Sequence, residues 1–243
     1  MAIKQTLQES KDKLDALLAY ANGTTGQADV SIGDAIKTLC DGYGGSAKDD
    51  TLKQLLEQTL DVWDDPNITK INFGLLRQNN KPPRVIRLVN CKSIAAEFLY
   101  SANTVLQELY LPSLTSVGTR LCFAQNGVKN LVFENATTVG QQAFAQCTGL
   151  EKIDFHKLVS FSYNGQFSRC TKLEALIMRG NAVVRGFSST ACIDSTAISA
   201  GNGYIYVNSA LVDAYKADSA WGVYADQIRA IEDYPDITGG AIV

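Results

Sequence analysis

The side chains that could do chemistry are few, and their spacing matches no familiar active site. His156 is the only histidine among 243 residues, which excludes a two-histidine metal site and the HExxH motif. The sequence also lacks a GxxxxGK[ST] phosphate loop, a GxGxxG dinucleotide fingerprint and a GxSxG nucleophile elbow. A cysteine nucleophile would have to pair with His156, and nothing in the local sequence activates any of the six thiols. We therefore expect His156 to be a surface or hydrogen-bonded polar residue.

Carboxylates offer two further kinds of site. Three aspartates lie close to Trp63 in the sequence: Asp61, Asp64 and Asp65. They could bind calcium, but their order does not match an EF-hand loop, and we expect a solvated helix end. A glycosidase needs two carboxylates across a cleft, which acids such as Glu134 and Asp154 do not specify. We predict a non-enzymatic protein with no cofactor and no metal, and keep a glycan-degrading enzyme as a third hypothesis.

Composition narrows the class of partner and the compartment. A net charge of −3 gives no basic field, so we expect no nucleic-acid partner. The six cysteines are scattered and form no CxxC pair, which favours reduced, buried thiols. Residues 1–6 carry no apolar export signal, and no run reaches the roughly 18 apolar residues of a membrane span. We expect synthesis in a cytoplasm and no membrane association.

The positions that could be functional belong to a repeat of 22 or 23 residues. The pattern LxxLxL begins at 106, 128, 150 and 173, with a weaker first copy at Pro83. This period lies within that of leucine-rich repeats. In each copy the last two apolar residues alternate, so both point to one face of a short strand. Five stacked coils would then form a continuous core, whereas one coil alone could not.

A second segment recurs in step with the first. Val139-Gly140 opens a stretch that runs through Ala143-Phe144 to Cys147, and residues 161–173 follow the same plan. We expect this return segment to be a short helical or irregular turn whose aromatic side chain fills the interior. Cys147 and Cys170 occupy the same turn of successive coils, which predicts a ladder of small buried residues.

Taken together, residues 139–155 and 106–112 resemble the BspA-like leucine-rich repeats of bacteria, and the resemblance covers about residues 83–234. It implies an α/β solenoid that is right-handed, with a parallel sheet on one face, used for adhesion and protein–protein contact. Two copies depart from the pattern: Leu121-Cys122 replaces Ala-Phe, and Phe161-Ser162 replaces Ile-Gly. Both keep apolar fillings, so they affect local geometry rather than the fold.

The C-terminal part is expected to close the solenoid with a helical cap, over residues 181–234. Residues 203–207 indicate a strand, and residues 208–218 an amphipathic helix with a polar N-cap. Large apolar residues then cover the exposed end of the core: Trp221, Tyr224, Ile228 and Ile231. This segment is similar to the cap that ends many BspA-like chains. We expect residues 235–243 to form a loose tail.

The first 82 residues carry no repeat and are predicted to be helical. A narrow apolar stripe, typical of a coiled coil, runs through Ile3, Leu7, Leu14 and Leu17. A second helix follows Ser31, and residues 42–46 form a glycine hinge. A third helix begins at Asp50, with Trp63 near its end, and residues 68–80 hold a short strand. The domains expected are therefore an attachment or oligomerisation module (1–46), a linker helix with an N-terminal cap (47–82) and the repeats (83–180). A plain N-terminal cap is the alternative for the module.

Residues 14–45 resemble the beginning of many structural proteins of bacteriophages that infect Gram-positive hosts. There a short helical module precedes a receptor-binding or decorating domain. The resemblance implies a virion protein, assembled in the bacterial cytoplasm and released by lysis, which would need no export signal. The module would bind other virion proteins and make a homo-oligomer, with a trimer favoured.

The outward strand positions are the candidate binding residues. They are Glu108, Tyr110, Asn130, Val132, Lys152, Asp154, Ala175 and Ile177. Adjacent coils are about 4.8 Å apart, so five strands present a face roughly 19 Å wide. Its mixture of aromatic, polar and aliphatic side chains suits contact with a protein or a glycan. The leading hypothesis is a phage or prophage tail-tip, fibre or head-decoration protein that contacts the host surface. The second is a cellular BspA-like adhesin or scaffold with no phage role.

Overall fold

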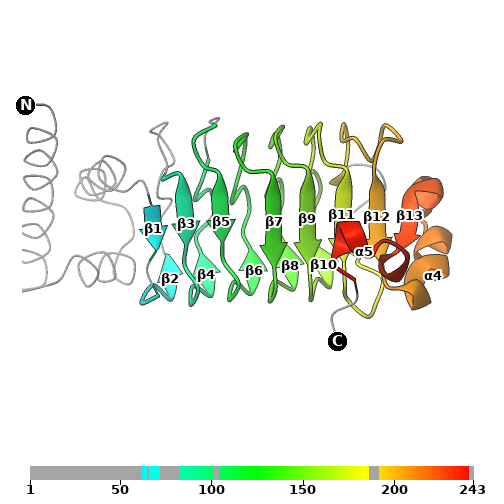
Figure 1. The fold of residues 1–243 in the computed structure, drawn as a ribbon, viewed down its shortest axis with the longest axis horizontal. Coiled ribbons are helices and arrows are strands. Elements are labelled where there is room, and N and C mark those ends of the chain that lie inside the picture. The colour runs from blue at the N-terminus through cyan, green and yellow to red at the C-terminus, as the bar shows by residue number, and fades with distance from the viewer. Residues whose placement is uncertain (1–61, 65, 72–82, 101–103, 186–191, 241–243) are drawn as a thin grey trace, which may run out of the picture.

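A computed structural model describes residues 62–64, 66–71, 83–100, 104–185 and 192–240. The described chain winds as a solenoid with a ladder of parallel strands along its long side (Figure 1). These strands are β1 (Val62–Asp64), β3 (Val85–Arg87), β5 (Glu108–Tyr110), β7 (Asn130–Phe133), β9 (Lys152–Phe155), β11 (Ala175–Met178), β12 (Tyr204–Val207) and β13 (Ile228–Ala230). They pair in two runs, β1-β3-β5 and β7-β9-β11-β12-β13, which lie next to each other (Figure 1). The expected parallel-sheet solenoid is therefore confirmed, and each copy of LxxLxL contains one of these strands.

A second, narrower set of parallel strands runs along another side of the solenoid. It consists of β2 (Lys70–Ile71), β4 (Ser93–Ile94), β6 (Ser116–Val117), β8 (Thr138–Val139) and β10 (Ser160–Phe161). The pairings are β2-β4 and β6-β8-β10. The coils that begin with β3, β5, β7 and β9 thus each hold one long strand, one two-residue strand and a return segment of turns. The sequence analysis did not anticipate the two-residue strands, because two residues are too short to show an alternating pattern.

The core is a column of side chains that repeats from coil to coil. Phenylalanines from the long strands alternate with phenylalanines from the return segments. Phe133 stacks on Phe155 with ring centroids 5.4 Å apart, and Phe144 stacks on Phe167 at 5.6 Å. All four are fully buried, which confirms that the aromatic of the return segment fills the interior.

The return segments are irregular turns, as expected, and they repeat a backbone conformation. Non-glycine residues at matching positions adopt positive φ, among them Glu97, Arg120 and Gln142. Arg120 donates to Oε1 of Gln142 at 2.8 Å and to Oε1 of Glu97 at 3.2 Å. These ladders of polar side chains link successive coils on the side away from the long strands.

The cysteines of the described residues are free and buried, as predicted: Cys91, Cys122, Cys147, Cys170 and Cys192. The predicted pair, Cys147 and Cys170, makes equivalent bonds to the preceding coil: Sγ of Cys147 donates to the backbone oxygen of Cys122 at 2.7 Å, and Sγ of Cys170 donates to that of Phe144 at 3.0 Å. Cys40 lies outside the described residues.

After the last repeats the chain is only partly helical. β12 is the predicted strand, and it continues the ladder beside β11. Short helices follow: η2 (Ser209–Leu211), α4 (Val212–Ala217), η3 (Gly222–Gln227), η4 (Ile231–Asp233) and α5 (Pro235–Thr238). Four large side chains seal this end of the core: Tyr215, Trp221, Tyr224 and Ile228. No helix in the described part of the chain has the length and apolarity needed to cross a bilayer.

Three local expectations were wrong. Trp63 does not end a helix but lies in β1, pairs with Ile86 and packs its ring 6.2 Å from Phe98, so the ladder starts one coil before Pro83. The ladder is also longer than five coils, since β12 and β13 continue it. Finally, the polar N-cap is absent: Asn208 donates instead to the backbone oxygens of residues 179 and 180, which fixes the strand end rather than a helix start.

Candidate binding face

The outer positions of the long strands form two rows across the ladder. One row contains Glu108, Asn130, Lys152 and Ala175, and the other contains Tyr110, Val132, Asp154 and Ile177. These are the eight predicted binding residues, and the parallel register brings them onto one side of the sheet. The proposed attachment residues Ile3, Leu7, Leu14 and Leu17 lie outside the described residues.

Half of this face is open to solvent. Tyr110 is 37% exposed and Val132 is 36% exposed, and Asn130 beside them is also exposed. The hydroxyl of Tyr110 lies 3.5 Å from Oε1 of Glu134. An exposed ring, an exposed aliphatic side chain and an amide next to one another can supply both contact area and directional hydrogen bonds to a partner. We call Tyr110, Asn130 and Val132 the open face.

An ion-pair network borders the open face. Nε and Nη2 of Arg87 donate to the two carboxylate oxygens of Glu108 at 2.5 and 2.7 Å. Asp64 lies 3.9 Å from Arg87. The hydrogen bond from Arg87 lowers the pKa of Glu108, and the same bond raises the pKa of Arg87. The sequence analysis missed Arg87 as an outer residue, although its place in the copy that begins at Pro83 matches that of Tyr110.

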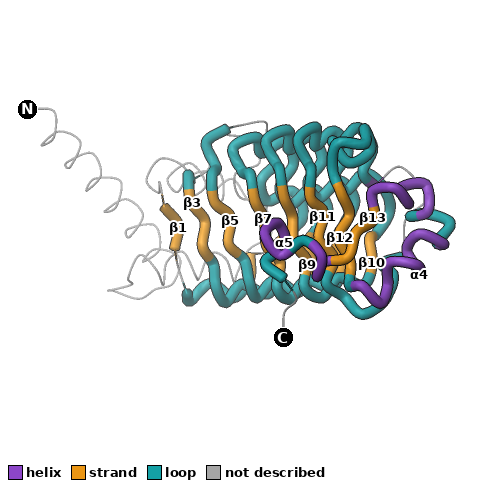
Figure 2. The backbone as a smooth tube through the Cα atoms, turned by 45° about the vertical axis from the view of Figure 1, so that its right-hand side comes forward, coloured by secondary structure: helices purple, strands orange, loops and turns teal. Residues whose placement is uncertain are grey.

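The other half of the face is covered by residues 231–240, which we call the C-terminal segment. Asp154, Ala175 and Ile177 are buried, although all three occupy outer positions. Ala175 and Ile177 form a second apolar cluster with Tyr206 and Ile231, separate from the solenoid core. Tyr234 packs against this cluster, with its ring 5.6 Å from that of Tyr206. In both Figure 1 and Figure 2, α5 lies in front of the long strands.

Arg179 joins the C-terminal segment to the sheet. Its guanidinium contacts both carboxylate oxygens of Asp154 at 2.8–3.0 Å. It also donates to the backbone oxygen of Gly240 at 2.5 Å and to that of Thr238. The side chains of Arg179 and Asp154 are only 8% and 9% exposed. The guanidinium of Arg179 and the carboxylate of Asp154 thus pair by charge and hydrogen bonds in a contact that largely excludes water.

Two expectations are corrected here. Residues 235–240 are not a loose tail, because α5 and the two glycines after it fold back on the sheet. Asp154, Ala175 and Ile177 are consequently not exposed binding residues. A signal for this was available: Ala175–Met178 and Tyr204–Val207 are unbroken apolar or aromatic runs, typical of strands that are covered on both sides.

A groove lies where the C-terminal segment meets the open face. Its volume is about 350 Å³. Asn130, Lys152 and Tyr204 line it from the sheet, and Asp236 and Ile237 line it from the C-terminal segment. The Nζ of Lys152 lies 3.3 Å from the backbone oxygen of Ile237. Glu151 and Glu174 also line the groove, which therefore combines amides and one ammonium group with three carboxylates and two aromatic rings.

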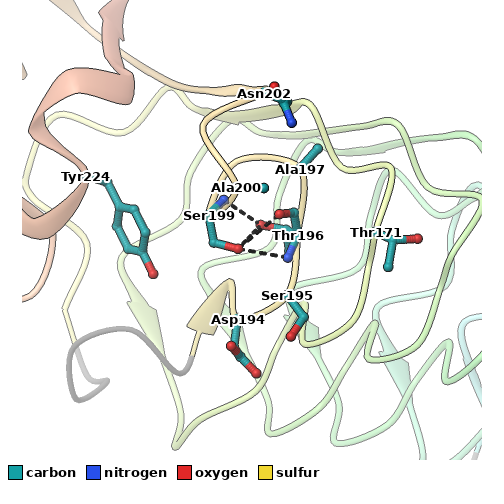
Figure 3. A pocket seen from close by; sticks show the side chains of 9 residues that line it. All are labelled: Thr171, Asp194, Ser195, Thr196, Ala197, Ser199, Ala200, Asn202 and Tyr224. Carbon is teal, nitrogen blue, oxygen red and sulfur yellow. Dashed lines mark hydrogen bonds between the residues drawn. The ribbon is translucent and has the colours of Figure 1, made fainter.

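A larger but shallower hollow lies on the return side of the last coils, with a volume of about 680 Å³ (Figure 3). Tyr224 lies on one side of it and Thr171 on the other, with Asp194 and Ser195 between them (Figure 3). At its centre, Thr196 and Ser199 bond to each other through their amides and hydroxyls at 3.0–3.1 Å. Because these polar groups close a turn, the hollow offers less to a ligand than the groove does.

Other chemical groups are placed as follows. His156 is partly buried, and its Nε2 lies 3.9 Å from Asp154. Asp64 belongs to β1 rather than to a helix end, while Asp61 and Asp65 lie outside the described residues. Glu134 contacts the hydroxyl of Tyr110. Within the described ranges, no group of three or more acidic, histidine or cysteine side chains could hold a metal ion.

Comparison with known proteins adds a family to this geometry. Residues 92–209 match the family model described as "BspA type Leucine rich repeat region", in six copies. No curated protein matches the chain. The matched range begins just before β4 and ends just after β12. It therefore includes the strands that carry the open face and the side of the groove that the sheet forms. Residues 92–209 are therefore similar to BspA-type leucine-rich repeats.

Proposed function

We propose that this chain is a non-enzymatic binding protein whose recognition surface is the open face together with the adjoining groove. The observation that carries this proposal is the exposure of Tyr110 and Val132 beside a groove with a mixed polar lining. Interfaces are enriched in aromatic side chains within a polar rim, and this surface has that composition. Leucine-rich repeats of this type are suited to binding and adhesion rather than to catalysis.

We further propose that the protein is a component of a phage or prophage virion, in a tail tip, fibre or head decoration, and that the open face contacts the host surface. The support is the resemblance of residues 14–45 to phage structural proteins. In this proposal the N-terminal module attaches the chain to other virion proteins and forms a homo-oligomer, a trimer in the favoured case. The surface partner is a host protein or glycan.

Mass spectrometry of density-purified phage particles from a lysate of the source strain tests the virion role. Peptides of this chain at stoichiometric abundance are the expected result, and the copy number would separate a tail tip from a head decoration. Peptides found only in the cell fraction would contradict the virion role. They would favour a cellular adhesin or interaction scaffold built on the same recognition surface.

A further inference from the structure

We propose that Arg179 is a positioning residue of the recognition surface, because it holds residues 235–240 as a fixed wall of the groove. This inference rests on the proposed binding function. Arg179 does not line the groove itself. It acts through the C-terminal segment, which contributes Asp236 and Ile237 to the groove.

The contacts of Arg179 identify it as the point of attachment. One guanidinium joins the outer face of β9, through Asp154, to the backbone oxygens of Thr238 and Gly240. The planar group carries five N–H donors in a fixed arrangement, so it can bind both oxygens of a carboxylate and two carbonyl groups at once, whereas the three donors of a lysine cannot serve four acceptors. The segment is thereby held in a single place relative to the strands.

Residues 235–240 form a fixed wall rather than a movable lid, because several hydrogen bonds to largely buried groups attach them. The side chains of Arg179 and Asp154, which hold this segment, are only 8% and 9% exposed. The Thr238 hydroxyl donates to the backbone oxygen of Ile231 at 3.0 Å, and Arg179 donates to the backbone oxygens of Thr238 and Gly240. Opening the segment would break these contacts together and expose the paired Arg179 and Asp154 side chains to water.

The fixed segment changes the shape of the surface. Without Asp236 and Ile237, the sheet would present Lys152 and Tyr204 on an open plane. With them, these side chains face a groove of about 350 Å³ that has one acidic and one apolar element on the added side. Arg179 therefore sets which ligand the groove accepts, although it does not contact that ligand.

The test compares binding of fluorescently labelled full chains to intact cells of the source bacterium. The variants are Arg179→Gln, a chain that stops after Tyr234, and the two changes combined. The truncated chain keeps the Arg179–Asp154 pair, so it removes the wall without leaving a buried carboxylate unpaired. The control is Arg120→Gln, which disrupts an arginine ion-pair ladder on the return side. Thermal unfolding and circular dichroism establish that each variant is folded.

We expect Arg179→Gln and the truncation each to weaken binding about tenfold, the equivalent of one good contact. The combined variant should lose no more, because both changes act through one wall. Arg120→Gln should bind like the unaltered chain. A folded truncated chain that binds as well as the unaltered chain, or better, would overturn the proposal.

Hydrogen exchange gives a readout that needs no partner. The amides of residues 237–240 donate hydrogen bonds; they should be protected in the unaltered chain and should exchange rapidly in Arg179→Gln. Equal protection in both would overturn the positioning role even if binding changed. If the unaltered chain bound no cells, the proposed function would fail, while the exchange result would still decide whether Arg179 holds the wall.

Discussion

Replacing Phe144 with alanine should weaken the solenoid at its centre. The ring of Phe144 is fully buried and has three aromatic neighbours, with centroids 5.6 Å away for Phe133 and Phe167 and 6.4 Å away for Phe155. Buried Phe-to-Ala changes lower the free energy of unfolding by about 3–5 kcal/mol. Since whole domains have roughly 5–15 kcal/mol, this single change removes a large share of the stability.

Urea unfolding, followed by tryptophan fluorescence, measures this loss of unfolding free energy at both ends of the solenoid. The two tryptophans, Trp63 and Trp221, lie in the first and last parts of the described solenoid. With a urea slope of about 2–3 kcal/mol per molar, the expected loss lowers the midpoint by about 1–2.5 M. Because each coil contacts only its neighbours, we also expect the two ends to separate. One set of chains keeps only Trp63 and the other keeps only Trp221. The two reporters should give the same urea midpoint when residue 144 is Phe and different midpoints in Phe144→Ala.

Phe123→Ala is the matched control, because Phe123 is only partly buried and its ring contacts that of Tyr100 at 4.8 Å. It should cost about 1 kcal/mol and leave the two transitions coincident. The reasoning would be refuted if Phe144→Ala moved the midpoint no further than Phe123→Ala does. Such a result would mean that the stacked rings do not carry the cohesion between coils.

Four further predictions rest on glycine contacts, the buried ion pair and the buried thiols. A Cβ on Gly149 would lie 2.0 Å from a backbone oxygen of the preceding coil, whereas one on Gly118 would lie 3.5 Å from its nearest neighbour. Gly149→Ala should therefore lower stability by about 1–3 kcal/mol in urea unfolding, and an equal effect of Gly118→Ala would contradict this packing. Arg179→Met should cost about 3–5 kcal/mol because the buried Asp154 loses its guanidinium partner and keeps only His156, at 3.9 Å. Adding Asp154→Leu should recover part of that loss, and a double-mutant cycle without coupling would contradict the pairing. Burial raises the pKa of the Cys91 thiol from about 9 to about 11. A raised folded-state pKa means that its contribution to stability is complete below pH 9 and is lost as the pH rises toward 11, so unfolding titrations should show falling stability in that window. The described thiols should also react with a thiol reagent at pH 8 only after unfolding, and rapid labelling of the folded chain would contradict their burial.

The repeat could be predicted from the sequence because its physics is local and periodic. In Leu131-Val132-Phe133 the two apolar anchors point inward and the residue between them points outward, as the burial pattern of β7 shows. The same alternation places Tyr110 between its buried neighbours. Aromatic and cysteine positions of the return segment recur at the same period. A pattern that repeats several times outweighs the ambiguity of any one short strand.

The covered half of the face could not be predicted by the same reasoning, because it depends on a contact between residues far apart in sequence. Asp154 meets Arg179 and, through it, Gly240, which lies 61 residues beyond Arg179. Alternation correctly placed Ile177 outside the core, but it could not say that another segment would cover it. Trp63 was misplaced for a related reason, since a three-residue strand gains its identity from pairing with Ile86 rather than from its own pattern.

The most direct test of the recognition surface uses two double variants, each of which replaces two exposed side chains on a different side of the solenoid. One chain carries Tyr110→Ala with Val132→Asp on the open face. The other carries Tyr163→Ala with Val159→Asp, at positions that are 75% and 61% exposed and lie outside the long strands. Binding of both labelled chains to intact cells of the source bacterium is then compared with that of the unaltered chain. We predict a loss of about tenfold or more for the open-face pair and no change for the other pair. Retained binding by a folded open-face variant would contradict the central claim, and loss of binding by the other pair alone would move the recognition surface to the return side.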